Sequence, residues 1–434
     1  MALLRNTPPT CPASDKTPGT VHFGVITPPV PGHLNPFCAL GRELKHRGHR
    51  VTVFHMADVE QKITAEGLDF CTLGESDQPR GTLPTIITEI GKRSGMAAMR
   101  YTVNAAAQST RMLLRDGPEA IKRQSLDALL VDQTEPAGAT LAEHLGLPFV
   151  TVCNALAMNR EDTIPPPFVD WSYRKGYLWR YRNAVGYQIS HVAVRPITRV
   201  VTEYRERWGL RPYRSPEDSF SGRAQISQQV AEFDFPRESL PPSFHYVGPL
   251  RDRSPVERAF PWDELNGRPL VYASLGTLQG SKENVFRCFA EAVKDLPVQL
   301  VMSHGGALSS EAVAAMPGSV LVVDYAPQYE LLKRAHATLT HAGLNTVLDS
   351  LSHGVPMLAI PITYEQPAIA SRIEWAKVGT TLPLSKLSPR SVREALERVL
   401  GTADYRRSAV RVQTAIQRAG GVTRAVDLIE RSIS

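Results

Sequence analysis

The side chains best suited to acid–base chemistry lie near the amino terminus, after the first apolar run. His33 lies in the sequence TPPVPGHLNP, beside a predicted helix that Asn35 would cap and Pro36 would begin. An imidazole with an unperturbed pKa of about 6.5 can accept a proton near neutral pH. Asp132 ends another apolar run, ALLVD, and could hydrogen-bond His33 and stabilise its imidazolium. The two residues are a candidate general-base dyad, although His33 could simply start a helix and Asp132 could cap the next one.

A second group of polar side chains lies between residues 325 and 366. There the predicted strand ATLTH ends at His341, turns through Gly343 and enters a helix that Asn345 would cap. A helix start preceded by glycine presents free backbone N–H groups and the positive end of the helix dipole. His341 adds a side-chain donor and Thr346 adds a hydroxyl. These residues predict a phosphate-binding site.

Acidic and amide side chains near this predicted phosphate site suit sugar hydroxyls. Asp349 lies one helical turn beyond Asn345, where its carboxylate could accept hydrogen bonds from vicinal hydroxyls. Glu365 and Gln366 stand side by side where another predicted strand ends. The segment therefore suits a base, a ribose, phosphates and a second sugar. Taken singly, each residue has a structural alternative: Asn345 could be only a helix cap, Tyr325 ordinary packing, and Asp349 a solvated surface charge.

Both groups follow short apolar runs that alternate with helical patterns, as in parallel sheets covered on both faces. The runs are 22–27, 51–55, 128–131 and 148–152 in the first half, and LVYASL, 298–302, 320–324, 337–341 and 357–361 in the second. The pattern predicts an α/β protein with two Rossmann-like, doubly wound parallel-sheet domains facing each other across a cleft. Ligands of such sheets bind beyond the carboxyl ends of the strands, where the candidate residues lie.

The sequence between the two halves is rich in proline, serine and charged residues, which indicates a linker. The expected organisation is a flexible tail at 1–19, a first domain at 20–249, a linker at 250–266, a second domain at 267–405 and a helical segment at 406–434. We expect that the last segment could pack back on the first domain.

The composition narrows the function classes. The chain has 434 residues, 42% of them hydrophobic and 21% charged, with a formal net charge of +6, which suits a globular protein and does not favour nucleic acid as a partner. Apolar runs are too short for a transmembrane helix or a signal peptide. The five cysteines contain no CxxC pair, which argues against a disulfide framework or a structural zinc site and favours the cytoplasm. No GxGxxG follows a predicted strand, which argues against a dehydrogenase.

The segment from 325 to 366 resembles the nucleotide-sugar signature of the UDP-glycosyltransferases, an inverting family of GT-B fold. The matching residues are Pro327, Gln328, His341, Gly343, Asn345, Thr346, Asp349, Gly354, Val355, Pro356, Pro361, Glu365 and Gln366, with Ser274, Gly276 and Thr277 in LVYASLGT. The GHxxP-like context of His33 also matches. THAGLNTVLDSLSHGVP is more similar to the bacterial carotenoid-glucosyltransferase and macrolide-glycosyltransferase branches than to plant members, which have Trp at Tyr325 and Glu at Asp349.

The resemblance implies a role for each matching residue. The implied contacts are Tyr325 stacked on uracil, Gln328 at the base, Asp349 at the ribose, His341, Asn345 and Thr346 at the diphosphate, Glu365 and Gln366 at the transferred sugar, and Ser274, Gly276, Thr277 and Gly343 in the surrounding loops. It also implies that His33, paired with Asp132, deprotonates an acceptor hydroxyl as this hydroxyl displaces UDP with inversion. The donor would be a UDP-hexose, with glucose expected, and neither a metal ion nor another cofactor would be required.

The acceptor side is the least defined part of this expectation. Residues 171–214 carry ten basic side chains against two acids, interleaved with Trp and Tyr. This segment could dock on anionic lipid at the inner membrane face, or it could be a solvated helical lid over an acceptor pocket. Residues 94–113 could form another wall of that pocket. The acceptor stays open between carotenoid alcohols, polyketides and phenolics. Two other functions also stay open: a catalytically silent nucleotide-sugar-binding partner of another transferase, and a UDP-sugar epimerase.

Overall fold

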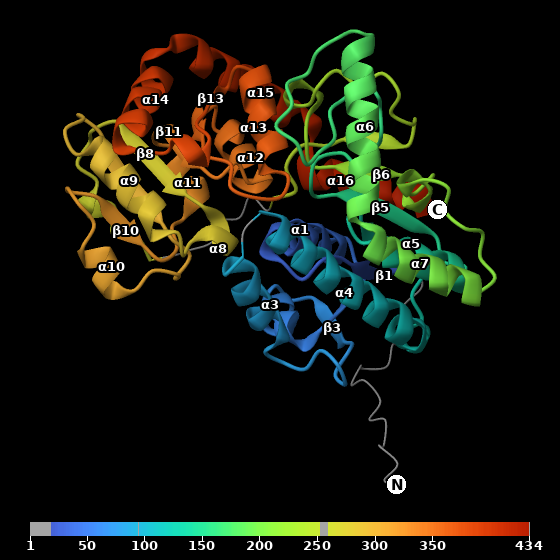
Figure 1. Ribbon diagram of the computed structural model, residues 1–434. Coiled ribbons are helices and arrows are strands. Elements are labelled where there is room, and N and C mark those ends of the chain that lie inside the picture. The colour runs from blue at the N-terminus through green and yellow to red at the C-terminus, as the bar shows by residue number, and fades with distance from the viewer. Residues whose placement is uncertain (1–18, 94, 252–258, 434) are drawn as a thin grey trace.

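Two layered α/β domains lie side by side in the computed structural model (Figure 1). The structure describes residues 19–93, 95–251 and 259–433. Almost all of the expected tail at 1–19 and the middle of the expected linker at 250–266 lie outside the described residues. Each domain is built on a parallel sheet, which confirms the predicted fold class.

The first domain contains a seven-stranded parallel sheet with the order β3-β2-β1-β4-β5-β6-β7. Its strands are β1 (His22–Ile26), β2 (Arg50–His55), β3 (Asp69–Thr72), β4 (Ala128–Asp132), β5 (Phe149–Cys153), β6 (Gln225–Ser227) and β7 (Phe244–Tyr246). Every residue of β1 and β4 is buried, as expected for strands covered on both faces. These two strands are neighbours, and the strand order switches direction between them. Ligands of doubly wound sheets bind at such a switch point.

The helices of the first domain are α1 (Pro31–His46), α2 (Glu60–Ala65), α3 (Thr82–Gly91), α4 (Gly95–Gln124), α5 (Pro136–Leu145), α6 (Tyr177–Ala193) and α7 (Arg195–Arg207). α1 begins at Pro31, whose fixed φ suits the first position of a helix. The predicted start at Pro36 is therefore wrong, and Asn35 lies inside the helix. Because Pro36 has no N–H, it cannot donate to the carbonyl of Gly32 four residues earlier. That carbonyl remains available to another donor.

The second domain contains a six-stranded parallel sheet with the order β10-β9-β8-β11-β12-β13. Its strands are β8 (Leu270–Ser274), β9 (Gln299–Ser303), β10 (Leu321–Val323), β11 (Ala335–Thr340), β12 (Met357–Ala359) and β13 (Gly379–Thr381). Its helices are α8 (Gly276–Gln279), α9 (Glu283–Val293), α10 (Ser310–Ala314), α11 (Gln328–Leu332), α12 (Leu344–Ser352), α13 (Gln366–Trp375) and α14 (Pro389–Gly401). α12 begins at Leu344 with Gly343 at the cap position. The prediction that Asn345 caps this helix is wrong, because Asn345 lies inside the first turn.

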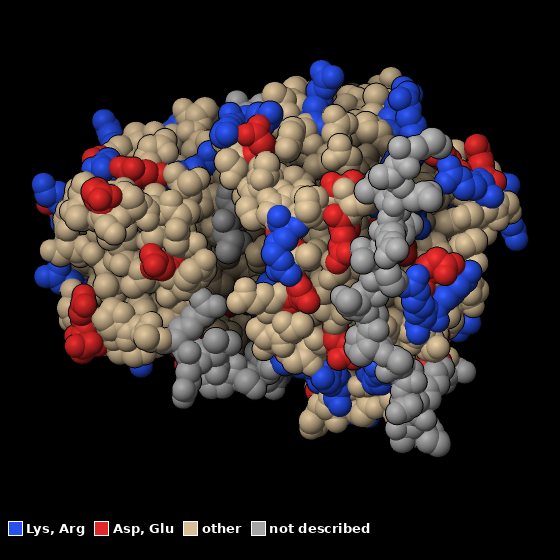
Figure 2. Space-filling view, turned by 90° about the horizontal axis from the view of Figure 1, so that it is seen from below, with Lys and Arg blue, Asp and Glu red and all other residues tan. Residues whose placement is uncertain are grey.

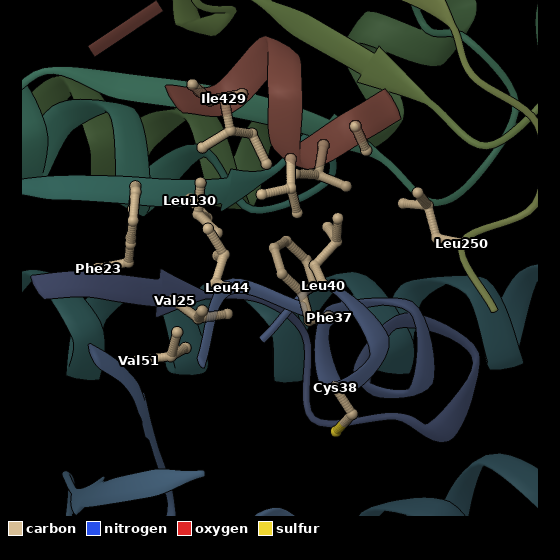
Figure 3. Packing of buried hydrophobic residues seen from close by; sticks show 14 of the residues in the cluster. Phe23, Val25, Phe37, Cys38, Leu40, Leu44, Val51, Leu130, Leu250 and Ile429 are labelled. Atoms are coloured by element: carbon tan, nitrogen blue, oxygen red, sulfur yellow. The ribbon is translucent and has the colours of Figure 1, made fainter. Parts of the chain in front are cut away.

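The last two helices, α15 (Ala403–Ala419) and α16 (Gly421–Ile433), bring the chain back to the first domain. Ile429 of α16 belongs to the same buried cluster as Phe37 and Leu44 of α1 (Figure 3). At the end of α1, the guanidinium of Arg47 contacts the carboxylate of Asp427 at 2.8 Å. The carboxyl-terminal helix thus stabilises the helix that carries His33.

The surface and the cysteines bear on possible partners. On the face in Figure 2, Lys and Arg side chains are interspersed with Asp and Glu, so this face lacks the single basic patch typical of nucleic-acid binding. Within the described ranges, every helix is too short or too polar to cross a bilayer. Cys38, Cys153 and Cys288 are free and buried. Cys71 is disulfide-bonded, which the spacing of the cysteines did not predict.

Candidate active site

The two residues of the predicted base dyad meet at the switch point of the first sheet. β1 and β4 are neighbouring parallel strands, so the start of α1 and the end of β4 lie at the same edge. Nδ1 of His33 donates to Oδ2 of Asp132 over 2.8 Å, since a carboxylate can only accept. The side chain of His33 is 20% exposed, whereas that of Asp132 is fully buried. The other ring nitrogen of His33, Nε2, is therefore the atom that can take a proton from a bound hydroxyl.

Asp132 is held in its charged form by its neighbours. Its Oδ1 accepts from the N–H and the hydroxyl of Thr134, at 2.9 and 2.6 Å, and its Oδ2 accepts from Asn154 at 2.9 Å. Burial opposes the charge, but His33 and the hydrogen bonds lower the pKa of Asp132 below its usual range. For His33, burial lowers the pKa, and the charge and hydrogen bond of Asp132 outweigh it, so the net pKa is raised. Glu135, not Asp132, caps α5.

Two further carboxyls lie within electrostatic reach of His33. Burial raises the pKa of Glu365, at the start of α13, to about 7, and the charge of His33 opposes that rise. Burial also raises the pKa of Glu135 to about 7, although its side chain accepts from the hydroxyl of Thr110 at 3.2 Å. Glu135 was not among the residues predicted from the sequence. The signal that could have found it is a glutamate directly before the proline that begins α5, at the end of the strand carrying Asp132.

His341 directly follows β11 and lies against two glycines. A Cβ at Gly276 would come within 2.8 Å of the His341 ring, and a Cβ at Gly343 within 2.4 Å, so only glycine lets both loops approach the ring. Burial lowers the pKa of His341 to about 4, which keeps the imidazole neutral at pH 7. Its Nδ1 is buried and has no hydrogen-bond partner in the described ranges. A buried polar nitrogen without a partner is a suitable contact for a ligand oxygen.

The loop after β8 lies beside this ring. The hydroxyl of Ser274 accepts from the N–H of Gly276 at 3.2 Å, which fixes the turn into α8. Thr277 belongs to α8, but its side chain lies outside the described part of the structure. Thr346, in the first turn of α12, is buried. The structure therefore gathers Ser274, Gly276, His341 and the start of α12 at the switch point of the second sheet.

Asn345 connects the second domain to the first. Its Nδ2 donates to the carbonyl of Gly32 over 2.9 Å, which is the carbonyl that the proline inside α1 leaves available. Its Oδ1 accepts from Nε2 of Gln228 at 3.1 Å, and the same nitrogen donates to the carbonyl of Asn154 at 2.6 Å. Asn154 in turn donates to Asp132. A hydrogen-bonded path thus joins α12 to the base dyad. Two members of this path, Gln228 and Asn154, were not predicted from the sequence.

The residues expected at the nucleoside lie on and beside α12. Oδ2 of Asp349 accepts from Nε2 of Gln328 at 2.6 Å, and Oδ1 of Asp349 accepts from Nε of Arg251 at 3.1 Å. Tyr325 is 49% exposed, and its ring passes 3.7 Å from the position of a Cβ on Gly306. Gln328 and Asp349 are therefore in direct contact, and the ring of Tyr325 presents a large open surface.

The loop between β12 and α13 holds the last pair of predicted residues. Oε1 of Gln366 accepts from the N–H groups of Ile362 and Thr363, each at 2.8 Å, so this oxygen orders its own loop. Tyr364 has a left-handed φ of 56°, a strained conformation for a non-glycine residue. Glu365, next to it, is electrostatically coupled to His33 across the domain boundary. Glu365 therefore lies toward the base, whereas the side-chain oxygen of Gln366 is used for hydrogen bonds within its own loop.

Comparison with known proteins defines the class. The fold is that of GT-B glycosyltransferases: the calicheamicin glycosyltransferase CalG4 matches with a TM-score of 0.72 at 23% identity, over 95% of this chain and 98% of that one. A family model described as "UDP-glucoronosyl and UDP-glucosyl transferase" matches residues 92–419, and one described as "Glycosyltransferase family 28 N-terminal domain" matches residues 31–152. The chain belongs to the UDP-glucoronosyl and UDP-glucosyl transferase family, as the resemblance in the sequence indicated.

Relatives with assigned activities match along nearly their whole length. The zeaxanthin glucosyltransferase of Pantoea ananas is 36% identical over 413 residues, which cover 94% of this chain and 95% of the relative. The 4'-demethylrebeccamycin synthase of Lentzea aerocolonigenes is 28% identical over 428 residues, which cover 94% and 98%. Together with the family model, these relatives identify an enzyme that transfers a sugar.

Proposed function

We propose that this enzyme moves glucose from UDP-glucose to a hydroxyl of a small lipophilic acceptor, with inversion at the anomeric carbon. One observation carries the proposal. His33 bonds Asp132 at 2.8 Å, and the carbonyl of the preceding residue, Gly32, accepts from Asn345 of the predicted diphosphate site at 2.9 Å. A proton acceptor and a predicted anion site therefore meet at one domain boundary.

In the proposed reaction, His33 is the general base. The acceptor hydroxyl gives its proton to Nε2 of His33 while its oxygen forms a bond to the anomeric carbon. The bond from that carbon to the UDP oxygen breaks, and its electron pair leaves with UDP. Because the attack comes from the side opposite UDP, the configuration inverts. Asp132 stabilises the imidazolium, and base assistance of this kind contributes about 10²- to 10⁴-fold in rate.

The negative charge on departing UDP would be met by the start of α12 and by His341. In the described part of the chain no side chain caps the N-terminus of α12, so its first N–H groups can bind phosphate oxygens at the positive end of the helix dipole. Nδ1 of His341, when it carries the ring proton, can donate to another phosphate oxygen. We propose that no metal ion and no further cofactor take part, so EDTA should leave the rate unchanged.

The nucleoside would lie over the residues beside α12. The exposed ring of Tyr325 suits stacking on uracil, and the amide of Gln328 suits the edge of the base. Asp349 would accept from the ribose hydroxyls, with Arg251 fixing its carboxylate at 3.1 Å. Glu365, with a pKa raised by burial to about 7, would contact the hydroxyls of the transferred hexose near His33.

Carotenoid alcohols are the acceptors that the relatives favour, since the Pantoea ananas protein is named a zeaxanthin glucosyltransferase. Polyketide and phenolic alcohols are the alternatives. An apolar wall is available at the start of α4, where Met96 and Met99 are 68% and 39% exposed. Burial raises the pKa of the Tyr364 phenol and Thr102 of the same helix opposes that rise, so this wall lies beside the loop of Glu365. We propose that the reaction takes place in the cytoplasm.

The test is a product assay with UDP-glucose and a panel of hydroxylated acceptors that includes zeaxanthin. Mass spectrometry should detect the glucoside, and His33→Ala should lower its formation at least ~10²-fold while UDP binding, measured by calorimetry, persists. His245→Ala, a histidine of β7, is the matched control and should stay active. Undiminished transfer by His33→Ala would refute the base. Conversion of UDP-glucose to a different UDP-hexose, with no glucoside formed, would identify an epimerase. Binding of UDP-glucose without turnover would identify a catalytically silent partner of another transferase.

A further inference from the structure

One helix of the first domain exposes an apolar face that nothing in the described structure covers. Its large apolar side chains are exposed by 91% (Tyr177), 70% (Leu178), 72% (Tyr181), 40% (Val185), 65% (Ile189) and 52% (Val192). They recur along α6 at the three- and four-residue spacing that places side chains on one face of a helix. In Figure 1, α6 extends above the strands of the first domain. Exposed apolar patches of this kind mark interaction surfaces.

The opposite face of α6 anchors the helix to the domain. Asn183 and Gly186 are both buried, and Nδ2 of Asn183 donates to the carbonyl of Asp162 at 3.0 Å. A Cβ at Gly186 would come within 2.8 Å of Trp171, so glycine is needed for this close packing. The apolar face is therefore held outward by a fixed helix.

The charged side chains of α6 and of the two residues before Gly176 are all basic. α6 contains no Asp or Glu, whereas Arg174 and Lys175 just before it and Arg180 within it are exposed. The guanidinium of Arg182 stacks on two tryptophans, Trp171 at 4.6 Å and Trp179 at 4.8 Å. Tryptophan and tyrosine prefer the boundary between water and lipid. Apolar side chains, aromatic rings and the exposed basic residues of this segment together match an anionic bilayer surface.

We propose that α6 docks in the plane of an anionic membrane, with this apolar face buried among the lipid head groups and the basic residues beside it. A second copy of the chain fits less well, because pairing two α6 faces would bring like charges such as Lys175 and Arg180 together. The binding itself needs no acceptor. Its use rests on the proposed function: a lipophilic alcohol dissolved in the bilayer would reach the enzyme without crossing water.

The test is flotation of the full-length protein with vesicles of phosphatidylcholine alone or mixed with phosphatidylglycerol. The wild type should float with the anionic vesicles, and high salt should release it. Lys175→Glu/Arg180→Glu should weaken binding at least ~20-fold, since each basic residue near the surface contributes about fivefold. Leu178→Gln/Tyr181→Gln/Ile189→Gln should abolish flotation. The control is Leu384→Gln/Val410→Gln, which removes one exposed apolar residue of the second domain and one of α15 and should float like the wild type.

Several outcomes would overturn the proposal. One is a wild type that does not bind anionic vesicles. Another is an equal loss of flotation in the control variant. A third is a wild type that sediments as a dimer without any vesicle binding, where the triple variant sediments as a monomer. Transfer to an acceptor dispersed in detergent separates the two proposals. The triple variant should keep this activity and lose only transfer to acceptor embedded in vesicles. Vesicle binding without transfer to any acceptor would contradict the proposed function and leave the docking surface standing.

Discussion

Replacing Gln228 by leucine should weaken the contact between the domains while leaving His33, Asp132 and the residues of the predicted phosphate site in place. Nε2 of Gln228 donates to Oδ1 of Asn345 at 3.1 Å and to the carbonyl of Asn154 at 2.6 Å. Loss of the bond to Asn345 costs about 1 kcal/mol, or about a fivefold smaller population of the joined arrangement. Loss of the bond to Asn154 leaves a buried carbonyl unpaired, which costs about 1–3 kcal/mol of unfolding free energy.

The assay combines steady-state kinetics with UDP-glucose and chemical denaturation. Gln228→Leu should lower kcat/KM for the donor about fivefold, because Gln228 orients the amide of Asn345. Gln229→Leu is the matched control. This neighbour is equally buried, and among the described residues its side chain accepts only from the N–H of Ala157 at 3.3 Å, within the first domain. The control should lose stability and keep its donor kinetics. Unchanged kinetics in Gln228→Leu, or the same loss in both variants, would refute the reasoning.

Two further predictions concern the packing around the site. Gly343→Ala should lower transfer at least ~10-fold, because the new Cβ would lie 2.4 Å from the ring of His341, whereas Gly222→Ala, which meets nothing within 4 Å, should be silent in the same product assay. Arg372→Leu should lower the unfolding free energy by about 3 kcal/mol in denaturant titrations, because it breaks a buried ion pair with Asp234 at 2.8 Å across the domains. Burial opposes ionisation of Asp234, but arginine charges hold its pKa at about 2. Its contribution to stability is therefore complete above the unfolded-state pKa of about 4 and is lost as pH falls toward 2. In Asp234→Asn, the unfolding free energy should depend less on pH between about 4 and 2. An unaltered pH dependence in this range would contradict the assignment of this stability to Asp234.

The central strands could be predicted because burial on both faces leaves an unbroken apolar run. The short strands β6, β7 and β13 could not, since QIS, FHY and GTT have only three residues each and contain polar side chains. The starts of α1 and α12 were both predicted wrongly, because an asparagine near each start was expected to be the cap. Asn35 and Asn345 are strong cap residues, yet the helices begin at Pro31 and Leu344. In the second case the amide that would have capped the helix bonds the other domain instead.

The parts of the candidate site that could be predicted are those whose residues all lie at the strand ends of one sheet. His33 lies after β1 and Asp132 is the last residue of the adjacent parallel strand β4, so their contact is expected from the topology. The residues around His341 likewise lie at the ends of the adjacent strands β8 and β11. Their chemical roles stay predictions. Gln228 lies on the edge side of the first sheet and reaches Asn345 of the second, so the contact depends on how the domains dock. No local pattern encodes such a contact. The hydrogen bond from Arg251 to Asp349 likewise could not be predicted from a local sequence pattern.

The most direct test of the base is the pH dependence of kcat/KM for the acceptor in the wild type and Asp132→Asn. Asp132 raises the pKa of His33, so wild-type activity should fall as pH drops through that raised pKa. Without this carboxylate, the inflection should move to lower pH, and the plateau should fall about 10²- to 10⁴-fold. The same inflection in both proteins, or an Asp132→Asn plateau equal to that of the wild type, would contradict the account.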